Sequence, residues 1–316
     1  MSRTNLNRRG PAGWLSPALV FFLAVTPAMA GPAADYLAAL AAAPAQYLPE
    51  PKAAPAFPLK SGGALNAYFI SVGQGDSEYI ELPNGRNALI DGGPAAGTTR
   101  LAQFLAQHNV THLDYVVLTH PHADHFSGLK YVFDNLKVDN FYDTREANPG
   151  AATLTALRNE IAGNHTTVIN YPAADDTLPW DPGEVQVKVL NSCSAAGQST
   201  DGHALNDCSI VLKITYQNTS ILYTGDMESD VEGALVSKYG AALQADVLKV
   251  GHHGSATASS TPFLNMVKPK YAYIEVGAGN TFGHPTQAAL GRLQAAGATI
   301  YRTDTGGTQE YAIGAN

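Results

Sequence analysis

From about residue 64 onward, short runs of apolar and β-branched residues alternate with turns rich in glycine, proline and asparagine. Such runs predict strands, and longer segments with apolar positions three or four apart predict helices. The predicted strands cover residues 67–72, 77–82, 87–91, 113–118, 185–190, 210–216, 220–223 and 246–250. The predicted helices cover residues 98–107, 153–162, 229–239 and 286–296, and residues 299–302 and 308–313 are expected to form a final strand pair. Both halves place strands before helices, which predicts two sheets packed face to face with helices outside.

The N-terminal segment has a different character. Three arginines precede a short apolar stretch over residues 14–25, and an Ala-Met-Ala sequence follows it. This order is typical of a signal peptide over residues 1–30, with an uncleaved anchor as the alternative. Residues 31–62 are rich in alanine and proline and are expected to form a leader, and residues 63–316 one domain. We therefore expect an exported protein, periplasmic or secreted, without stable membrane insertion after signal removal.

Composition and charge limit the classes of partner. The chain has 45% hydrophobic and 15% charged residues, which is typical of a globular protein. Its formal net charge is −8, and the expected signal carries three arginines and no acidic residue, so the mature chain would be more acidic still. Such a charge argues against broad electrostatic capture of polyanions.

The chain contains two cysteines, Cys193 and Cys208, which follow and precede two predicted strands. In an oxidising compartment they are expected to pair, and the disulfide would then clip the loop between those strands. A cysteine ligand to zinc is the alternative, although the spacing matches no familiar zinc pattern.

Residues 119–125, Thr-His-Pro-His-Ala-Asp-His, concentrate possible metal ligands between a predicted strand and the start of a predicted helix. Imidazole nitrogen and carboxylate oxygen are ligands that zinc and similar divalent ions take. The alternative is a solvated polar loop. Later segments could complete such a site: Asp226 ends the strand Ile-Leu-Tyr-Thr-Gly-Asp, His252 and His253 follow another strand, and His284 precedes a helix.

The order His-x-His-x-Asp-His, Thr-Gly-Asp and His-His-Gly-Ser resembles the metallo-β-lactamase superfamily, and the resemblance covers roughly residues 64–316. Within that superfamily, residues 71–77, 206–212 and 248–255, with Gly283-His-Pro285, are similar to the hydrolase domain of the ComEC family of DNA-internalisation competence proteins. The resemblance implies an α+β fold, a four-layer αββα sandwich with metals at the edge between the sheets.

The resemblance also implies two divalent metal ions held by six side chains, namely His120, His122, Asp124, His125, Asp226 and His252. The first two would hold one ion and the next two the other, with Asp226 bridging both and His252 completing the second site. Asp91 would steady the histidine loop through hydrogen bonds. His253 is expected behind the ligands or in the packing.

One departure from the superfamily pattern concerns the first ion. Many members have a further histidine before the Gly-Asp motif, and here the equivalent region offers His203, Asn206 or Asp207. A site with fewer protein ligands would bind its ion more weakly or keep more water. Zinc is expected, and this departure makes manganese the alternative.

The resemblance implies a metal-dependent hydrolase, a phosphodiesterase or nuclease, whose partner is a phosphodiester such as single-stranded DNA. Asp124 would orient the attacking water, and Ser255 and His284 would contact the scissile phosphate or protonate a leaving group, with loop capping as the alternative role for both.

Other functions stay open. They are a phosphorylcholine-type esterase, a β-lactamase or lactonase, and a metal-binding protein without turnover. The acidic charge argues against tight, non-specific binding of DNA. No cluster of interleaved aromatic and basic residues predicts a stacking platform for its bases either. A small phosphodiester is therefore an alternative substrate. The remaining histidines, His108, His112 and His165, are expected at the surface.

Overall fold

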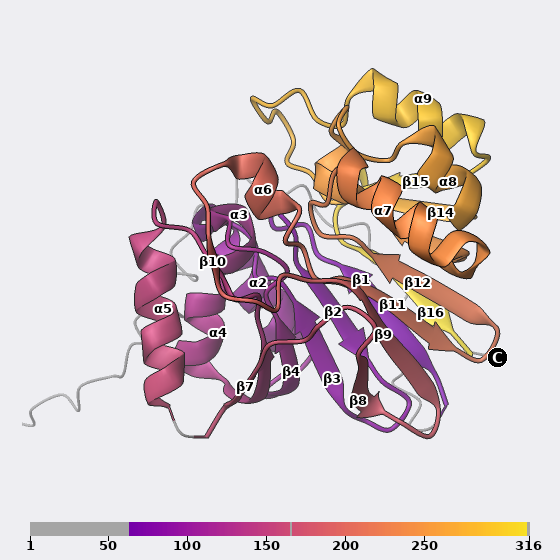
Figure 1. The fold of residues 1–316 in the computed structure, drawn as a ribbon. Helices are drawn as coiled ribbons and strands as arrows, with labels where there is room; N and C mark the ends of the chain where they lie inside the picture. Colours follow the sequence, from indigo (N-terminus) through magenta and orange to yellow (C-terminus); the bar gives the residue numbers. More distant parts are fainter. Residues whose placement is uncertain (1–62, 165, 315–316) are drawn as a thin grey trace, which may run out of the picture. The chain divides into compact units, whose positions relative to one another are not determined.

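The computed structural model describes residues 63–164 and 166–314. The expected signal peptide, the expected leader and His165 lie outside these residues. The described chain forms two seven-stranded sheets that face each other, with helices on both outer sides (Figure 1). This is the αββα sandwich that the sequence predicted.

The first sheet contains the N-terminal strands and the last strand of the chain. In spatial order its strands are β16 (Gln309–Ile313), β1 (Leu65–Phe69), β2 (Glu78–Glu81), β3 (Asn87–Ile90), β4 (His112–Val117), β5 (Lys137–Tyr142) and β7 (Val168–Asn170). Strands β16 to β3 pair antiparallel, whereas β3, β4, β5 and β7 run parallel. The carboxyl ends of β3 and β4 therefore meet at one edge of this sheet.

The second sheet repeats this mixture. In spatial order its strands are β15 (Thr299–Arg302), β14 (Tyr271–Ile274), β13 (Val247–Lys249), β12 (Thr219–Tyr223), β11 (Val211–Tyr216), β9 (Val185–Asn191) and β8 (Thr177–Asp181). Strands β12 to β15 run parallel, and β8, β9, β11 and β12 pair antiparallel. A separate parallel pair joins β6 (Glu146–Ala147) to β10 (Gly197–Gln198).

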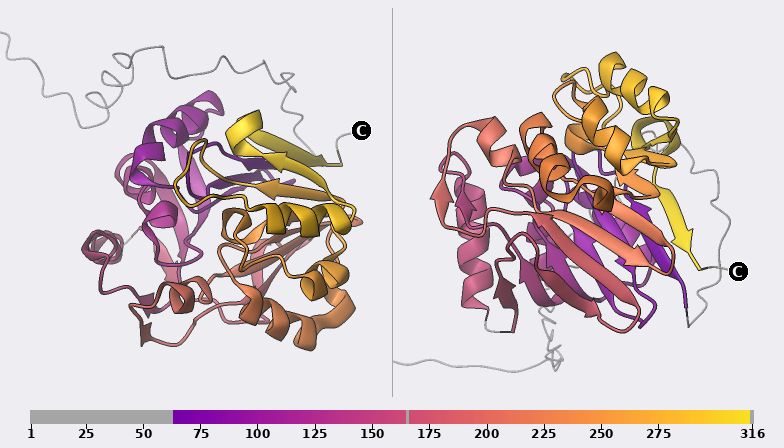
Figure 2. Two further views of the ribbon diagram at one scale, coloured as in Figure 1. Left: turned by 90° about the horizontal axis from the view of Figure 1, so that it is seen from above. Right: turned by 45° about the vertical axis from the view of Figure 1, so that its right-hand side comes forward.

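Helices cover the outer face of each sheet, as the two views in Figure 2 show. The helices are α2 (Thr98–Gln107), α3 (Ala123–Phe126), α4 (Leu129–Asn135), α5 (Ala152–Gly163), α6 (Gly202–Asn206), α7 (Ser229–Tyr239), α8 (Thr261–Val267), α9 (Gln287–Ala295) and α10 (Thr303–Gly306). Helices α2, α4 and α5 pack on the first sheet, and α7, α8 and α9 pack on the second. None of the described helices has the length and apolar character needed to cross a membrane.

Strand periodicity explains the layers. Because successive side chains of a strand point to opposite faces, Ala67 and Phe69 of β1 enter the core between the sheets, while Tyr68 and Ile70 face the helices. Across the central core Phe69 stacks on Tyr273 of the other sheet, with ring centroids 4.1 Å apart. An aromatic pair of this kind adds about 1 kcal/mol to the stabilisation from burial.

The predicted final strand pair is wrong. Strand β15 joins the second sheet beside β14, whereas β16 crosses to the first sheet and pairs with β1. The hydrophobic pattern of two adjacent strands does not show whether they pair with each other. Here the turn α10 between them redirects the chain to the other sheet. Strands β5, β7, β8 and β14 and helix α8 were not predicted.

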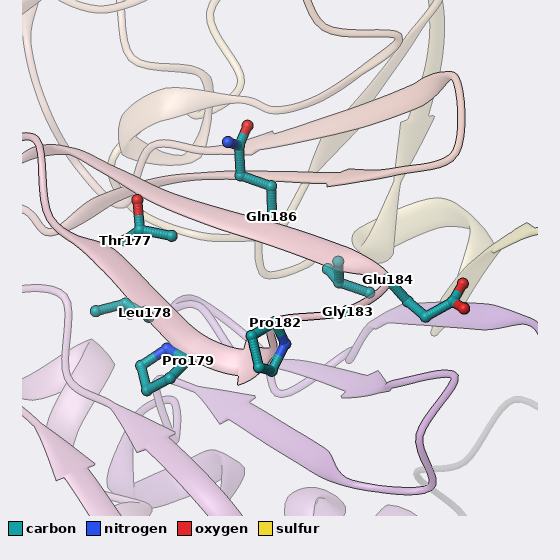
Figure 3. Close-up of a pocket in the computed structure, with 8 residues that line it drawn as sticks. Thr177, Leu178, Pro179, Pro182, Gly183, Glu184 and Gln186 are labelled. Atoms are coloured by element: carbon teal, nitrogen blue, oxygen red, sulfur yellow. The ribbon is translucent and has the colours of Figure 1, made fainter.

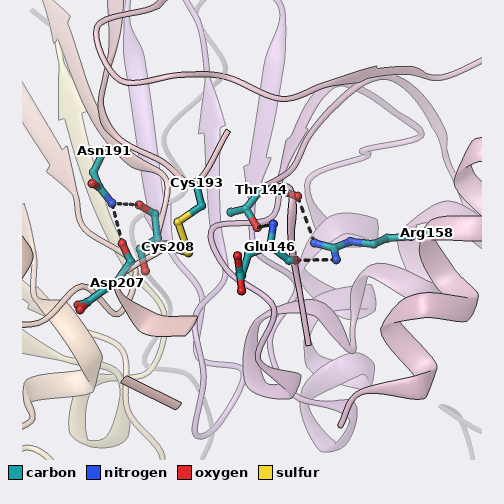
Figure 4. The surroundings of a disulfide bond; sticks show 8 residues. Thr144, Glu146, Arg158, Asn191, Cys193, Asp207 and Cys208 are labelled. Atoms are coloured by element: carbon teal, nitrogen blue, oxygen red, sulfur yellow. Dashed lines mark hydrogen bonds between the residues drawn. A yellow bond between two sulfur atoms is a disulfide. The ribbon is translucent and has the colours of Figure 1, made fainter. Parts of the chain in front are cut away.

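The predicted disulfide between Cys193 and Cys208 is confirmed (Figure 4). It joins the end of β9 to the start of β11, which pair antiparallel as expected. The side chain of Asn191 supports the same junction by donating hydrogen bonds to the backbone carbonyls of Asp207 and Ser209, each 2.9 Å long. The loop that carries α6 is therefore closed at its base.

Candidate metal centre

Four segments that end strands converge at one edge of the sandwich. Asp91 follows β3 and the histidine loop follows β4 in the first sheet, while Asp226 follows β12 and the His252-His253 pair follows β13 in the second. Parallel pairing puts the carboxyl ends of β3 and β4 side by side, and likewise those of β12 and β13. In open α/β sheets this edge is the usual place for a ligand.

A backbone hydrogen bond joins the two sheets here, because the Ile210 amide donates to the Thr119 carbonyl (2.9 Å). Within the second sheet's edge, the Asp226 amide donates to the Ser209 hydroxyl (3.0 Å). Gly225 has a φ of +51°, and a side chain there would press on Ser209 and Thr119. A glycine at this position lets Asp226 approach the histidine loop closely.

Four side chains form a cluster at this edge, namely Asp124, His125, Asp226 and His253, with one ligand atom of each within 4.8 Å of the others. Asp226 Oδ2 lies 3.3 Å from His125 Nε2 and 3.4 Å from His253 Nε2. Asp124 Oδ2 lies 3.3 Å from His253 Nε2. Two carboxylates and two imidazoles in this arrangement match the ligand preferences of zinc and related divalent ions.

The unsatisfied atoms of the cluster fit a metal as well. Nε2 of His125, Nε2 of His253 and Oδ1 of Asp226 are buried, and within the described chain they make no hydrogen bond. Buried polar atoms normally have partners. A divalent ion between them would satisfy all three.

The charges of the cluster depend on one another. Burial opposes ionisation of Asp226, but His253 and His125 lower the pKa of its carboxyl well below the usual range. Burial likewise opposes protonation of His125, but Asp226 and Asp91 raise its pKa well above the usual value. Protons on these histidines balance the carboxylates, so binding of a divalent ion would release protons.

Asp91 holds the cluster from behind, as expected. Its Oδ2 lies 2.7 Å from His125 Nδ1 and accepts a hydrogen bond from the Thr119 hydroxyl (2.6 Å), and its Oδ1 accepts from the Thr119 amide (2.8 Å). A carboxylate oxygen accepts only, so the Nδ1 of His125 donates and its Nε2 faces the cluster.

His120 and His122 lie beside the cluster. Their Nε2 and Nδ1 atoms are 3.0 Å apart, and His120 Nε2 is 3.9 Å from Asp226 Oδ2. Burial, followed by the charge of His125, lowers the pKa of both imidazoles. Both are therefore neutral near pH 7, which is the form of imidazole that binds metals.

Among the three candidates for the missing histidine position, Asn206 faces His122. The Asn206 side chain opposes the lowering of the His122 pKa, and its Oδ1 is buried without a hydrogen bond among the described residues. His203 is 70% exposed in its side chain and pairs with Glu228 at 2.6 Å. Asp207 lies at the end of α6, next to the disulfide.

The structure reverses the expectation for the His252-His253 pair. His253, which the sequence placed behind the ligands, is in the four-residue cluster, whereas His252 Nε2 is 3.9 Å from Asp226 and its Nδ1 is 2.9 Å from Glu228 Oε1. Both residues have left-handed backbone angles, with φ of +46° and +53°. This turn sends the second histidine, and not the first, into the cluster.

His284 and Ser255 differ in placement. The His284 ring lies 5.5 Å from the His252 ring and 6.4 Å from the His253 ring, at the rim of the centre. The Ser255 hydroxyl lies 2.8 Å from the Thr257 hydroxyl and accepts from the Thr257 amide, which is the loop capping that the sequence left open. The structure therefore brings His284 to the site and engages Ser255 locally.

Two residues at the centre were not predicted. Glu228 contacts His203, His252 and Asn206, and Asp76 lies 3.1 Å from His253 Nδ1. Glu228 follows Asp226 by two residues, so an acidic pair at a strand end was the available signal. Asp76 belongs to the Gly-Gln-Gly-Asp motif that carried part of the resemblance.

Two predicted surface histidines are partly buried. His108 stacks on Phe104, with ring centroids 4.2 Å apart, and His112 Nε2 lies 2.9 Å from Asp139. A separate pocket lies along the β8–β9 hairpin and is lined by Thr177, Leu178, Pro179, Pro182, Gly183, Glu184, Val185 and Gln186 (Figure 3). Those residues surround the hairpin turn and include none of the metal-centre side chains.

Known proteins resemble this chain in sequence. Competence protein ComA of Neisseria gonorrhoeae is 32% identical over 243 residues, which are 77% of this chain and 31% of that protein. ComE operon protein 3 of Bacillus subtilis (strain 168) is 29% identical over 262 residues, which are 77% of this chain and 32% of that protein. The chain thus spans about a third of the length of these curated relatives.

Solved structures resemble it in fold. The metallo-beta-lactamase fold protein YhfI from Bacillus subtilis aligns with a TM-score of 0.51 over 77% of this chain and 99% of its own, at 12% identity. CmlA, a diiron β-hydroxylase from Streptomyces venezuelae, aligns with a TM-score of 0.51 over 80% of this chain and 55% of its own, at 13% identity. The family match covers residues 70–277, from directly after β1 to just beyond β14. With the αββα fold and the histidine loop in place, this chain belongs to the metallo-β-lactamase superfamily.

Proposed function

We propose that this protein is an exported, metal-dependent hydrolase of phosphodiesters. The observation that carries the proposal is the buried cluster of Asp124, His125, Asp226 and His253, whose imidazole Nε2 atoms are free of hydrogen bonds within the described chain. His120 and His122 lie next to it. Family membership supports hydrolysis, because superfamily members are mostly metal-dependent hydrolases.

Two groups of side chains would hold two divalent ions, with zinc first and manganese as the alternative. Asp124, His125 and His253 would hold one, and His120 and His122 the other, with Asp226 shared between them. Asn206 is the candidate to complete the group of His120 and His122, since its Oδ1 is buried beside His122. Bound divalent ions supply Lewis acidity, which activates water and polarises the ester under attack.

Asp124 differs from its neighbours in exposure. Its side chain is 34% exposed, whereas those of His125 and Asp226 are 0% and 2% exposed. Burial opposes ionisation, but His125 and His253 hold the pKa of Asp124 well below the usual range. Asp124 is thus an ionised acceptor that water can reach, and we assign it the orientation of the attacking water.

His284 is placed to contact the substrate. Burial, and then the charges of His252 and His253, lower the pKa of His284, so its ring is neutral near pH 7. A neutral imidazole still has one N–H, which would donate a hydrogen bond to a phosphate oxygen.

We infer single-stranded DNA as the first candidate substrate. One curated relative is named as a competence protein, and Phe282 offers an exposed aromatic face next to the centre. Phe282 is 67% exposed and its ring stacks near the His284 ring, with centroids 5.9 Å apart. Exposed aromatic rings bind nucleobases by stacking. A small phosphodiester is the second candidate, favoured by the net charge of −8.

Export is part of the proposal. It is supported by the expected signal over residues 1–30 and by the Cys193–Cys208 disulfide, since disulfides persist in oxidising compartments.

One set of assays tests the function. Purified protein loaded with zinc or with manganese would be assayed on bis-p-nitrophenyl phosphate, on single-stranded DNA and on nitrocefin. We expect phosphodiester cleavage that is lost in His120→Ala and in Asp124→Ala. Fully metal-loaded protein that cleaves no phosphodiester would refute the proposal, and strong nitrocefin hydrolysis would point to a β-lactamase instead. Elemental analysis of the same samples gives metal identity and number.

A further inference from the structure

The Gly-Gln-Gly-Asp segment, residues 73–76, contacts the histidine loop and His253 of the metal centre. A side chain at Gly75, where φ is +147°, would meet the Asp124 carbonyl oxygen at 2.2 Å, so the backbone of Gly75 lies directly against the histidine loop. Gln74 Oε1 accepts a hydrogen bond from the Gly277 amide (3.1 Å), which begins the loop that leads to His284. The segment thus connects both sides of the centre.

Asp76 ends this segment in full burial and faces His253. Its Oδ1 lies 3.1 Å from His253 Nδ1 and makes no hydrogen bond within the described chain, because that nitrogen donates to the Glu275 backbone carbonyl at 2.9 Å. Carboxylate and carbonyl oxygens accept only. The Nδ1 of His253 therefore carries a proton, and its Nε2 faces Asp124 and Asp226, where it would bind a metal ion after releasing its own proton.

Lys249, the last residue of β13, fixes the carboxylate of Asp76 from the other side. Its ammonium group binds Asp76 Oδ2, and both side chains are fully buried. An ammonium group donates only, so the oxygen beside Lys249 must be an acceptor. In an Asp76→Asn variant the amide oxygen would turn to Lys249, and the amide NH₂ would then face the N–H of His253.

The neighbouring histidine also has a buried carboxylate beside its Nδ1, and there the contact is a hydrogen bond. Asp91 contacts His125 Nδ1 at 2.7 Å and leaves His125 Nε2 toward the cluster. Each of the two buried imidazoles of the cluster therefore has its own carboxylate behind it, one from the end of β3 and one from residue 76. Carboxylates in this position orient a metal-binding histidine and increase its basicity.

We propose that Asp76, held by Lys249, is the positioning residue that prepares His253 to bind the second metal ion. This inference rests on the metal centre of the proposed function. It gives the Gly-Gln-Gly-Asp segment a role: to deliver a carboxylate to His253 while its glycine packs against Asp124.

Metal affinity tests this proposal directly. The full chain and its Asp76→Asn variant would be titrated with zinc against a chromophoric chelator, and bound zinc would be counted by elemental analysis. We expect Asp76→Asn to lose about 10- to 100-fold in affinity for one ion and to keep its affinity for the other. Cobalt substitution adds a spectroscopic readout, since the absorption of one of the two ions should be lost.

Two further variants separate positioning from general damage to the core. Glu78→Gln changes a buried carboxyl that lies beside Asp76 and Glu275 and outside the metal cluster, and we expect it to retain both ions. The double variant Asp76→Asn with Lys249→Met removes the buried cation left without its partner, which should restore thermal stability. We expect weak binding of one ion to persist in that double variant.

Different results would contradict the role of Asp76 and the presence of the metal centre. Wild-type affinity for both ions in Asp76→Asn, or recovery of the lost ion together with stability in the double variant, would overturn the role of Asp76. A wild-type protein that binds no divalent ion would overturn the proposed function along with it.

Discussion

His125 Nδ1 lies 2.7 Å from Asp91 Oδ2, and both side chains are fully buried where β3 and β4 end. The contact joins two neighbouring parallel strands of the first sheet. It also links the histidine loop to the core, because Asp91 accepts two further hydrogen bonds from Thr119.

Replacing Asp91 should therefore affect both stability and metal binding. We expect Asp91→Ala to lower the free energy of unfolding by about 3–5 kcal/mol, because a buried charged partner is removed. Metal affinity should fall about 10- to 100-fold. Urea unfolding and chelator competition measure the two effects. In the control Asp134→Ala, whose partner Lys130 is exposed, we expect a change of at most about 1 kcal/mol. Equal effects of the two variants would contradict this account.

The position of the missing histidine gives a second prediction. Asn206 faces His122, so Asn206→Ala should lower the affinity for the ion held by His120 and His122. Asn206→His should bind that ion more tightly than the wild type, because imidazole is the better zinc ligand. Metal titration checks both variants. His203→Ala is the matched control on the same helix, and its exposed side chain should leave affinity unchanged. A larger loss in His203→Ala than in Asn206→Ala would exchange their roles.

The exposed ring of Phe282 separates the candidate substrates. If DNA is cleaved, Phe282→Ala should raise KM for a single-stranded oligonucleotide and change kcat little. The reason is that the variant loses about 1–3 kcal/mol of stacking free energy with a base. Steady-state kinetics on oligonucleotides measure this effect. Tyr171→Ala removes another exposed aromatic ring and should leave KM unchanged. An unchanged KM in Phe282→Ala would favour a small phosphodiester.

Glu78 makes stability depend on pH. Burial, with the charge of Asp76 adding to it, raises the pKa of Glu78 from 4.5 to about 8. The native state therefore holds a proton that the unfolded chain has released, and the resulting stabilisation is complete below pH 4.5 and is lost as the pH rises through about 8. Glu78→Gln stays neutral, so its free energy of unfolding should change less over this interval.

Urea unfolding of chelator-treated protein at several pH values measures this difference. Asp134→Asn, at an exposed carboxyl, is the control and should keep the wild-type slope. The same slope in Glu78→Gln and the wild type would rule out Glu78 as the source.

Local pattern was sufficient for much of the fold. Helices α2 and α7 begin and end where the sequence predicted. Helix α2 buries one apolar face, and α7 has acidic residues in its first turn, Lys238 in its last turn and Gly240 directly after it. The partner of β16 could not be predicted in this way. Its pairing with β1 joins residues almost 250 positions apart, and no local signal distinguishes it from a hairpin with β15.

The metal centre shows the same division. His120, His122, Asp124 and His125 are close in sequence and therefore close in space. The choice between His252 and His253 depends on two left-handed backbone angles, which the residue types do not reveal. The contact of Asp76 with Lys249 spans 173 residues and appears only once the two sheets pack together.

The Cys193–Cys208 bond has a consequence for how the protein must be produced. It closes the loop that carries Asn206, and breaking a link across 15 residues frees chain entropy worth about 3 kcal/mol in the unfolded state. Protein made in a reducing cytoplasm would thus have a loosened wall beside His122. Preparations that differ only in oxidation would then differ in metal content, so thiol titration should accompany every metal analysis.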